Sequence, residues 1–128
     1  MTTTPVLQPT GTALVGRVRH YYELVDSGDI DGLVGLFAAD AVYNRPGYEP
    51  LIGHGDLRRF YHDQRIIDTG AHTVTRVVAD GYDVAVDGEF AGVLRDGRQV
   101  RLRFADFFTL APDLAFERRD TFFFAPLV

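Results

Sequence analysis

The stretch Tyr21-Tyr22-Glu23-Leu24-Val25-Asp26-Ser27-Gly28-Asp29-Ile30 predicts the end of one helix, a turn and the start of the next. Over residues 11–27, apolar side chains recur at three- and four-residue intervals, which places them on one helix face. These are Leu14, Val18, Tyr21, Tyr22 and Val25. Gly28 is suited to end this helix, and Asp29 is suited to cap a second one. The second helix carries Ile30, Leu33, Val34 and Phe37.

Downstream of this helix pair the pattern changes from helix to strand. A short strand is expected over residues 41–44, stopped by Pro46-Gly47, and a third helix over about 54–67. Alternating apolar residues separated by turn residues then predict four strands. Their expected ranges are 71–78, 84–94, 100–110 and 115–125. Helices followed by hairpin-connected strands indicate an α+β fold.

The length and charge of the chain limit the classes of function. With 128 residues it has enough material for one core, so we expect a flexible tail at 1–12 and a single domain at 13–128. The net charge of −5 argues against nucleic-acid binding, which depends on neutralising phosphates. No apolar run is long enough to span a bilayer, so no membrane association and a cytoplasmic location are expected.

Missing residue types narrow the chemistry further. The chain has no Cys, all 13 basic residues are Arg, and the only Ser is Ser27 in a turn. Thiol, Schiff-base and serine nucleophiles are therefore not expected. The four histidines lack metal-ligand spacing, so we expect neither a metal nor another cofactor. His72 is the most plausible alternative base among them. Carboxylates, histidines, tyrosines and arginines remain, which suits proton transfer, hydrolysis by an activated water or binding.

The third of the strands predicted after the helices, 100–110, carries an acid on an apolar face. Asp106 shares that face with Leu102, Phe104 and Phe108. A buried carboxylate is costly unless it is paired or neutral, so Asp106 is either a structural partner or a functional acid.

The other face of the same strand predicts an interface. Arg101, Arg103 and Phe107 lie there, and an aromatic ring among guanidinium groups suits a contact between copies. We therefore expect a homodimer.

The region from Tyr21 to Ile30 resembles the first helix and turn of bacterial ketosteroid isomerases, in the nuclear-transport-factor-2-like superfamily. The likeness continues at Asp40-Ala41, Pro46, Gly53, Phe60-Tyr61 and Ala105-Asp106-Phe107-Phe108. It implies a conical fold, in which about three helices pack on a strongly curved antiparallel or mixed sheet around an apolar pocket. It also implies that Tyr21 and a neutral Asp106 donate hydrogen bonds to an enolate-like oxygen.

One position departs from that family. Its general base is an aspartate immediately before the proline, and here that residue is Arg45. Because arginine stays protonated, steroid isomerisation by the family mechanism is not expected. Arg45 would instead bind a carboxylate, phosphate or ketone oxygen, or pair with a pocket acid such as Glu89. The alternative is a surface pair with Glu49.

The last strand carries a second resemblance. Arg118-Arg119-Asp120-Thr121-Phe122-Phe123 is similar to a segment of limonene-epoxide-hydrolase-like and SnoaL-like cyclase proteins, which implies a proton-handling role for Asp120. The register leaves two alternatives, because a shift of one residue exchanges the faces. Either Arg118, Asp120 and Phe122 face inward, or Arg119, Thr121 and Phe123 do.

The segment from Tyr43 to Pro50 and the closing aromatic residues also resemble small SnoaL-like proteins of polyketide clusters, including enediyne clusters. These resemblances imply an apolar, polyketide-like ligand and cofactor-free proton transfer, cyclisation or epoxide opening. The alternative is a protein that binds or shapes such a molecule beside its synthase without catalysis. The expected reacting groups are Tyr21, Asp106 and Asp120. The expected ligand-binding residues are Arg45, Tyr43, Tyr61, Glu89, Phe104, Phe108, Arg119 and Phe123.

Overall fold

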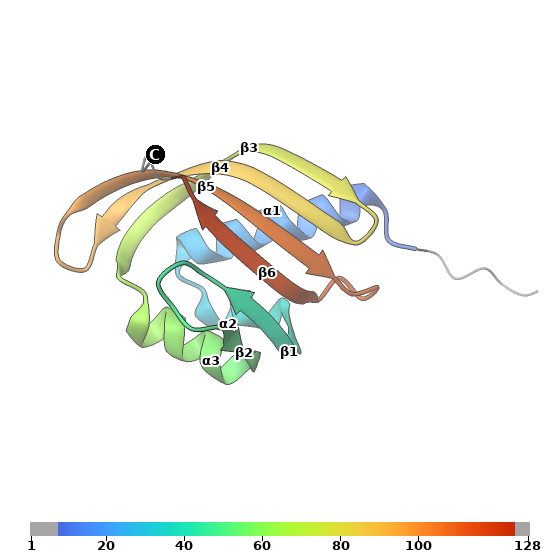
Figure 1. The fold of residues 1–128 in the computed structure, drawn as a ribbon, viewed down its shortest axis with the longest axis horizontal. Helices are drawn as coiled ribbons and strands as arrows, with labels where there is room; N and C mark the ends of the chain where they lie inside the picture. The colour runs from blue at the N-terminus through green and yellow to red at the C-terminus, as the bar shows by residue number, and fades with distance from the viewer. Residues whose placement is uncertain (1–7, 125–128) are drawn as a thin grey trace, which may run out of the picture.

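In a computed structural model of the protein, which describes residues 8–124, helices cover one face of a curved six-stranded sheet (Figure 1). The helical elements are α1 (Gly11–Ser27), α2 (Ile30–Gly35), α3 (Gly53–Arg59) and η1 (Phe60–Gln64). The strands are β1 (Phe37–Asn44), β2 (Leu51–Ile52), β3 (Ile67–Asp80), β4 (Asp83–Leu94), β5 (Gln99–Leu110) and β6 (Phe116–Phe123).

The sheet is mixed and open, with strand order β2-β1-β6-β5-β4-β3. Strands β3 to β6 form an antiparallel meander, and β1 pairs with β6 in parallel. The meander bends over α1, while α2 and α3 lie near β1 and β2 (Figure 1). The expected α+β fold with a curved mixed sheet is therefore confirmed.

Local chemistry sets the boundaries of α1. The hydroxyl of Thr10 accepts a hydrogen bond from the backbone N–H of Ala13 at 3.1 Å. Gly28 adopts the left-handed conformation, with φ of 75°, and closes the last turn through bonds to Leu24 and Val25. The five expected apolar positions of this helix are all buried. Because Thr10 caps the helix, Gly11 and Thr12 belong to α1 rather than to a tail. Residues 1–7 lie outside the described part of the chain.

Several element boundaries differ from those expected from the sequence, and one strand was not expected. Phe37, expected on the second helix, begins β1, and the short strand β2 was not anticipated. The third helix does not reach Ile67, because its last turn widens and Arg65 donates its N–H to the carbonyl of Phe60, five residues back, at 2.7 Å. Strand β3 then begins at Ile67. The last strand ends at Phe123, and its expected end at Ala125 lies outside the described residues.

Close packing within the meander depends on glycine at two positions of β4. A Cβ on Gly88 would lie 2.6 Å from Cζ of Phe104, and one on Gly92 would lie 2.6 Å from Cζ of Phe90. Both rings belong to the inner face of the sheet and are buried. The two glycines therefore leave the space in which these rings lie.

Candidate functional site

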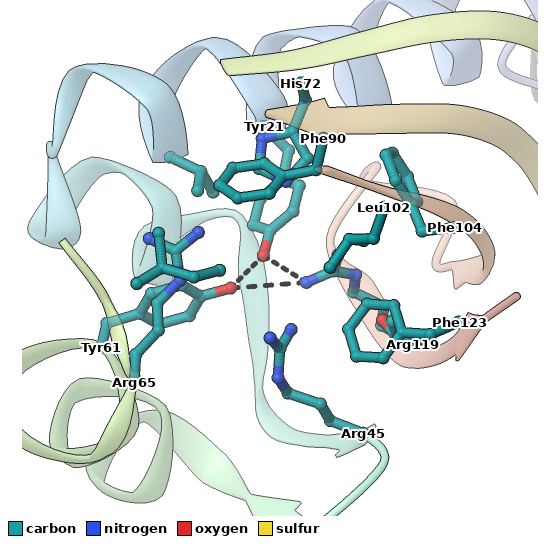
Figure 2. Close-up of a pocket in the computed structure, with 13 residues that line it drawn as sticks. Tyr21, Arg45, Tyr61, Arg65, His72, Phe90, Leu102, Phe104, Arg119 and Phe123 are labelled. Atoms are coloured by element: carbon teal, nitrogen blue, oxygen red, sulfur yellow. Dashed lines mark hydrogen bonds between the residues drawn. The ribbon is translucent and has the colours of Figure 1, made fainter. Parts of the chain in front are cut away.

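A cavity lies between α1, η1 and the inner face of the sheet (Figure 2). Its lining contains three arginines, two tyrosines and, among the described residues, no carboxylate. The lining residues are Tyr21, Val25, Arg45, Tyr61, Arg65, Ile67, His72, Phe90, Leu102, Phe104, Arg119, Thr121 and Phe123. The volume of the cavity that is accessible to the centre of a water molecule is about 30 Å³. The cavity as it stands therefore has room for about two water molecules.

Arg119 is the centre of the polar network. Its Nη1 donates to the hydroxyl of Tyr21 at 2.6 Å and to that of Tyr61 at 3.4 Å, and the two hydroxyls hydrogen-bond each other. Figure 2 shows these three groups converging at the cavity. The guanidinium lies over the rings of Tyr21 and Tyr43, at 4.8 and 4.5 Å from their centroids. Only 4% of Arg119 is exposed. Aromatic faces and hydroxyl acceptors thus fix its orientation.

Asp106 lies behind Arg119 and does not line the cavity. It is fully buried on the inner face, as its strand position indicated. Arg119 donates its Nη2 to Asp106 at 2.7 Å, and the hydroxyls of Tyr22 and Thr121 also donate to the carboxyl. Burial acts to lower the pKa of Arg119, but Asp106 together with the surrounding tyrosines outweighs it, and the pKa is raised well above its ordinary value.

This arrangement corrects the expected role of Asp106. A neutral acid would donate to a ligand, whereas here every hydrogen-bond partner of the carboxyl is a donor and Asp106 only accepts. The geometry is that of a structural ion pair. The group that presents donors to the cavity is Arg119. It has the donor role that the resemblance implied for Asp106.

Arg45 enters the cavity from the opposite side, after the end of β1 (Figure 2). Its Nη1 donates to the hydroxyl of Tyr43 at 3.0 Å, and its guanidinium lies 5.2 Å from the ring centroid of Phe60 and 5.1 Å from that of Phe123. Burial acts to lower the pKa of Arg45, but Tyr43 and Tyr61 together outweigh it and the pKa is raised. Arg45 is thus a cation held between two aromatic rings.

A chain of hydroxyls connects Arg45 to the buried carboxylate. The hydroxyls of Tyr43 and Thr121 are 3.1 Å apart, and Thr121 bonds to Asp106. A hydroxyl has a single hydrogen, so Thr121 donates to the carboxylate and Tyr43 donates to Thr121. Tyr43 therefore supports the site from behind rather than lining it.

The network contains more donors than acceptors. Tyr21 and Tyr61 both accept from Arg119 and share one hydrogen bond, so one of their two hydroxyl hydrogens remains for a ligand or water. Within residues 8–124, the buried Nε atoms of Arg45 and Arg119 also lack an acceptor. Burial raises the pKa of both Tyr21 and Tyr61, although Arg119 opposes it, so their hydroxyls stay protonated at neutral pH. The cavity is built for a ligand that supplies an acceptor atom.

Two residues expected in the pocket lie on the outer face of the sheet. The register of β6 turns Arg119, Thr121 and Phe123 inward, so Asp120 faces outward and bonds to Asn44 at 2.8 Å and to Arg118 at 2.9 Å. Burial acts to raise the pKa of Asp120, but Arg118 and Asn44 outweigh it and the pKa is lowered.

Glu89 is exposed on β4, because the positions that alternate with it, such as Phe90, face the interior. It therefore cannot partner Arg45. Phe108 faces inward but is buried behind the cavity, against the rings of Tyr21 and Phe116.

The structure adds residues that the sequence did not single out. Tyr22 and Thr121 hold Asp106, and Arg65, Phe90 and Leu102 line the cavity. Tyr22 was recognisable only as an apolar position of the first helix, and Thr121 depended on the register of β6. His72, the alternative base, does line the cavity.

Within the described part of the chain, no group of three or more histidines and acids could hold a metal ion. A search of the same residues found no helix long and apolar enough to cross a membrane.

Comparison with solved structures supports the fold. The structure reported for the epoxide hydrolase/cyclase-like enzyme SalBIII, described for its role in pyran ring formation in the polyether salinomycin, superposes with a TM-score of 0.79. The two chains are 21% identical, and the match covers 88% of this chain and 92% of that one. At this identity the likeness concerns the fold alone. The SnoaL-like domain model matches residues 18–117, which is most of the chain. The protein therefore belongs to the SnoaL-like domain family.

Proposed function

We propose that this protein binds an apolar small molecule through an electron-rich oxygen, such as a ketone, enolate or phenolate oxygen. The observation that carries the proposal is the convergence of Arg119, Tyr21 and Tyr61 on the cavity with a hydroxyl hydrogen to spare. A ligand oxygen there would accept from groups that are already oriented and sheltered from water. Preorganised donors of this kind stabilise developing negative charge more strongly than water does.

The walls of the cavity indicate the rest of the ligand. Phe90, Leu102, Phe104 and Phe123 supply apolar surface on the sheet side. Among the described lining residues there are three arginines and no carboxylate, and only Arg119 is neutralised by an adjacent acid, Asp106, so the cavity favours an anionic or easily polarised group. The family, together with a structural neighbour reported in pyran ring formation of a polyether, supports a polyketide-like ligand.

A ligand of that size needs more space than the closed cavity offers. A second groove, with about 420 Å³ open to the centre of a water molecule, adjoins the cavity and shares Val25, Tyr61, Arg65 and Ile67 with it. These four side chains form the partition between the two spaces. Displacement of the half-buried Arg65 and Ile67 would join cavity and groove into one site of substrate size.

Proton transfer, cyclisation and epoxide opening all develop negative charge on an oxygen, so the donor group suits each of them. Binding without catalysis is the second candidate. The observation that favours it is Arg45, a permanently charged residue where related isomerases place their base.

The test is a comparison of 2-naphthol with naphthalene, which share a shape and differ in the oxygen. We expect 2-naphthol to bind at least about tenfold more tightly, since hydrogen bonds to a charged donor contribute about 1.5–3 kcal/mol. Tyr61→Phe should reduce that preference several-fold. Tyr82→Phe is the matched control, because the Tyr82 hydroxyl bonds to Gln8 and does not line the cavity. Equal affinity of the wild-type protein for the two compounds would contradict the proposal.

A further inference from the structure

His72 and Asp26 form a dyad at the edge of the cavity. Nδ1 of His72 lies 2.5 Å from Oδ1 of Asp26, and the backbone N–H of His72 donates to Oδ2 at 2.9 Å. Asp26 lies in the last turn of α1 and His72 near the start of β3, 46 residues apart. The side chain of His72 is only 10% exposed and that of Asp26 only 25%. The carboxylate thus fixes both the backbone and the ring of His72.

This contact determines which ring nitrogen is available. The Asp26 carboxylate can only accept, so the neutral imidazole carries its hydrogen on Nδ1 and its lone pair on Nε2. Among residues 8–124, no hydrogen bond is made by Nε2, while the ring lines the cavity. The imidazole therefore keeps the lone pair of Nε2 free on a ring that lines the cavity.

The surroundings of the ring keep it neutral. The rings of Phe90, Tyr22 and Phe104 lie 4.8, 5.1 and 5.4 Å from it, centroid to centroid. Burial lowers the pKa of His72 below 6.5, and although Asp26 opposes this shift, the charges of Arg119 and Arg65 add to it. Asp26 and Tyr22 on α1, Arg65 after η1 and Arg119 on β6 are the titratable or charged groups that face His72.

We propose that His72 is the general base of this site and that Asp26 is its positioning residue, an assignment that rests on the proposed binding of a carbonyl oxygen by Arg119, Tyr21 and Tyr61. Nε2 removes a proton from the carbon beside the carbonyl. The electrons of the C–H bond form a C=C bond, and those of the C=O π bond move to the oxygen, which the three donors hold. When the ligand carries a C=C bond between the β- and γ-carbons of the ketone, the product is a dienolate; the imidazolium pairs with Asp26 and then returns its proton to the γ-carbon, which moves the C=C bond into conjugation with the carbonyl. The net change is an isomerisation without an oxidant, a reductant or a second reactant.

The assignment accounts for the substitution at the usual base position. Arg45 cannot remove a proton, but its guanidinium faces the oxygen-binding donors in Figure 2, while His72 lies on a different wall of the cavity. Base and oxygen site are thus contributed by different elements. A cation at position 45 adds to the stabilisation of the enolate instead of opposing it.

The experiment follows exchange of the acidic C1 hydrogens of 2-tetralone for deuterium in D₂O by proton NMR, with the full chain. The wild-type protein is expected to accelerate exchange above the buffer rate, and His72→Gln to lose about a hundredfold or more of that acceleration. Asp26→Asn should lose roughly tenfold and move the low-pH inflection of the rate to lower pH, because the imidazole loses its anionic partner. His20→Gln is the matched control, since His20 is exposed on α1 and is not one of the residues that line the cavity.

Four results would overturn the assignment. Exchange at the wild-type rate in His72→Gln excludes this base. A wild-type rate that does not fall as the pH is lowered through the pKa of His72 excludes it even if the variants do not fold. Absence of exchange in a wild-type protein that binds 2-naphthol also excludes it, while the binding proposal survives. If the wild-type protein shows no preference for 2-naphthol, the binding proposal and the dyad's assignment both fail.

Discussion

Two arginine–aspartate pairs begin at neighbouring residues of β6 and lie on opposite faces of the sheet. Arg119 and Asp106 approach to 2.7 Å inside, with side chains 5% and 0% exposed. Arg118 and Asp120 approach to 2.9 Å outside, with side chains 58% and 23% exposed. The two pairs have the same chemistry and similar length. Only their surroundings differ.

The difference decides what each pair can do. The outer pair is screened by water, so holding its long side chains together contributes little. The inner pair has lost its hydration, and breaking it would strand a charge in the core. That dependence keeps Arg119 ionised and oriented toward the cavity. Of the two consecutive arginines, Arg119 therefore stabilises the core and forms part of the site, whereas Arg118 is a surface residue.

Removal of the inner arginine gives the largest expected effect. Arg119→Met should reduce the free energy of unfolding by about 3–5 kcal/mol, because it leaves the Asp106 carboxylate buried without a cation. Arg118→Met is the matched control on the outer face and should leave stability nearly unchanged. Urea denaturation of both variants measures the contrast. Similar losses in the two would show that burial does not distinguish the pairs.

Substitution of the acids should show the same contrast in stability between the two pairs, with a smaller difference. Asp106→Asn keeps an acceptor for Thr121 and should cost about 2–3 kcal/mol, since it removes charge-assisted hydrogen bonds. Affinity for 2-naphthol should fall only indirectly, through a less firmly held Arg119, because Asp106 itself does not line the cavity. Asp120→Asn is the outer counterpart. A large loss of ligand affinity in Asp106→Asn, with stability intact, would restore the direct role that the sequence suggested for this acid.

Alkaline pH probes the inner face through its tyrosines. Burial raises the pKa of Tyr21 and Tyr22 well above 10 and also raises that of Tyr61. In the unfolded chain these groups ionise near pH 10, so the folded state loses stability as the pH rises above that value. The thermal midpoint should therefore fall above pH 10, and tyrosinate absorbance from these three residues should appear together with the loss of helical circular dichroism. Their ionisation in a protein that stays folded would contradict this expectation.

The smallest effect on stability is expected from the outer aromatic residues. Phe107 and Phe122 are 52% and 55% exposed, and the centroids of their rings are 5.9 Å apart. We propose that they belong to the expected homodimer interface, beside Arg101 and Arg103. Phe107→Glu should then convert a dimer to a monomer with the fold intact, as measured by sedimentation. A wild-type protein that sediments as a monomer at micromolar concentration would exclude the interface.

Much of the fold was predictable because it follows from local periodicity. The apolar spacing of the first helix, the Gly28 stop and the alternation of the strands each act over a few residues, and each gave the correct element. The errors arose where contacts outside the local pattern decide. The wide last turn of the third helical segment ends the helix earlier than its apolar face indicated, and β2 exists only because β1 pairs with it.

The sequence allowed several residues of the site to be predicted, but not the hydrogen bonds between them. Tyr21, Tyr61, Arg45 and Phe104 were expected at the pocket and line the cavity. The sequence left open which side chains reach Asp106, because the register of β6 decides whether Arg119 and Thr121 or Arg118 and Asp120 face inward. The contact between Asp26 and His72 joins the end of a helix to the start of a strand 46 residues later, a separation that no sequence spacing indicates.

The two glycines of β4 have a consequence for how this cavity can change during evolution. Gly88 and Gly92 are not among its lining residues, yet the rings of Phe104 and Phe90 rest in the space they leave. A methyl group at either position would meet a backbone carbonyl as well as the ring: a Cβ added to Gly88 would lie 2.7 Å from Thr73 O, and one added to Gly92 would lie 2.4 Å from Thr69 O. Neither the strand nor the ring could give way alone, and the displaced ring would narrow the cavity. The spacing of the main chains thus limits the volume available to a ligand. A related protein that binds a larger substrate must therefore replace Phe90 or Phe104 with a smaller residue rather than change the glycines.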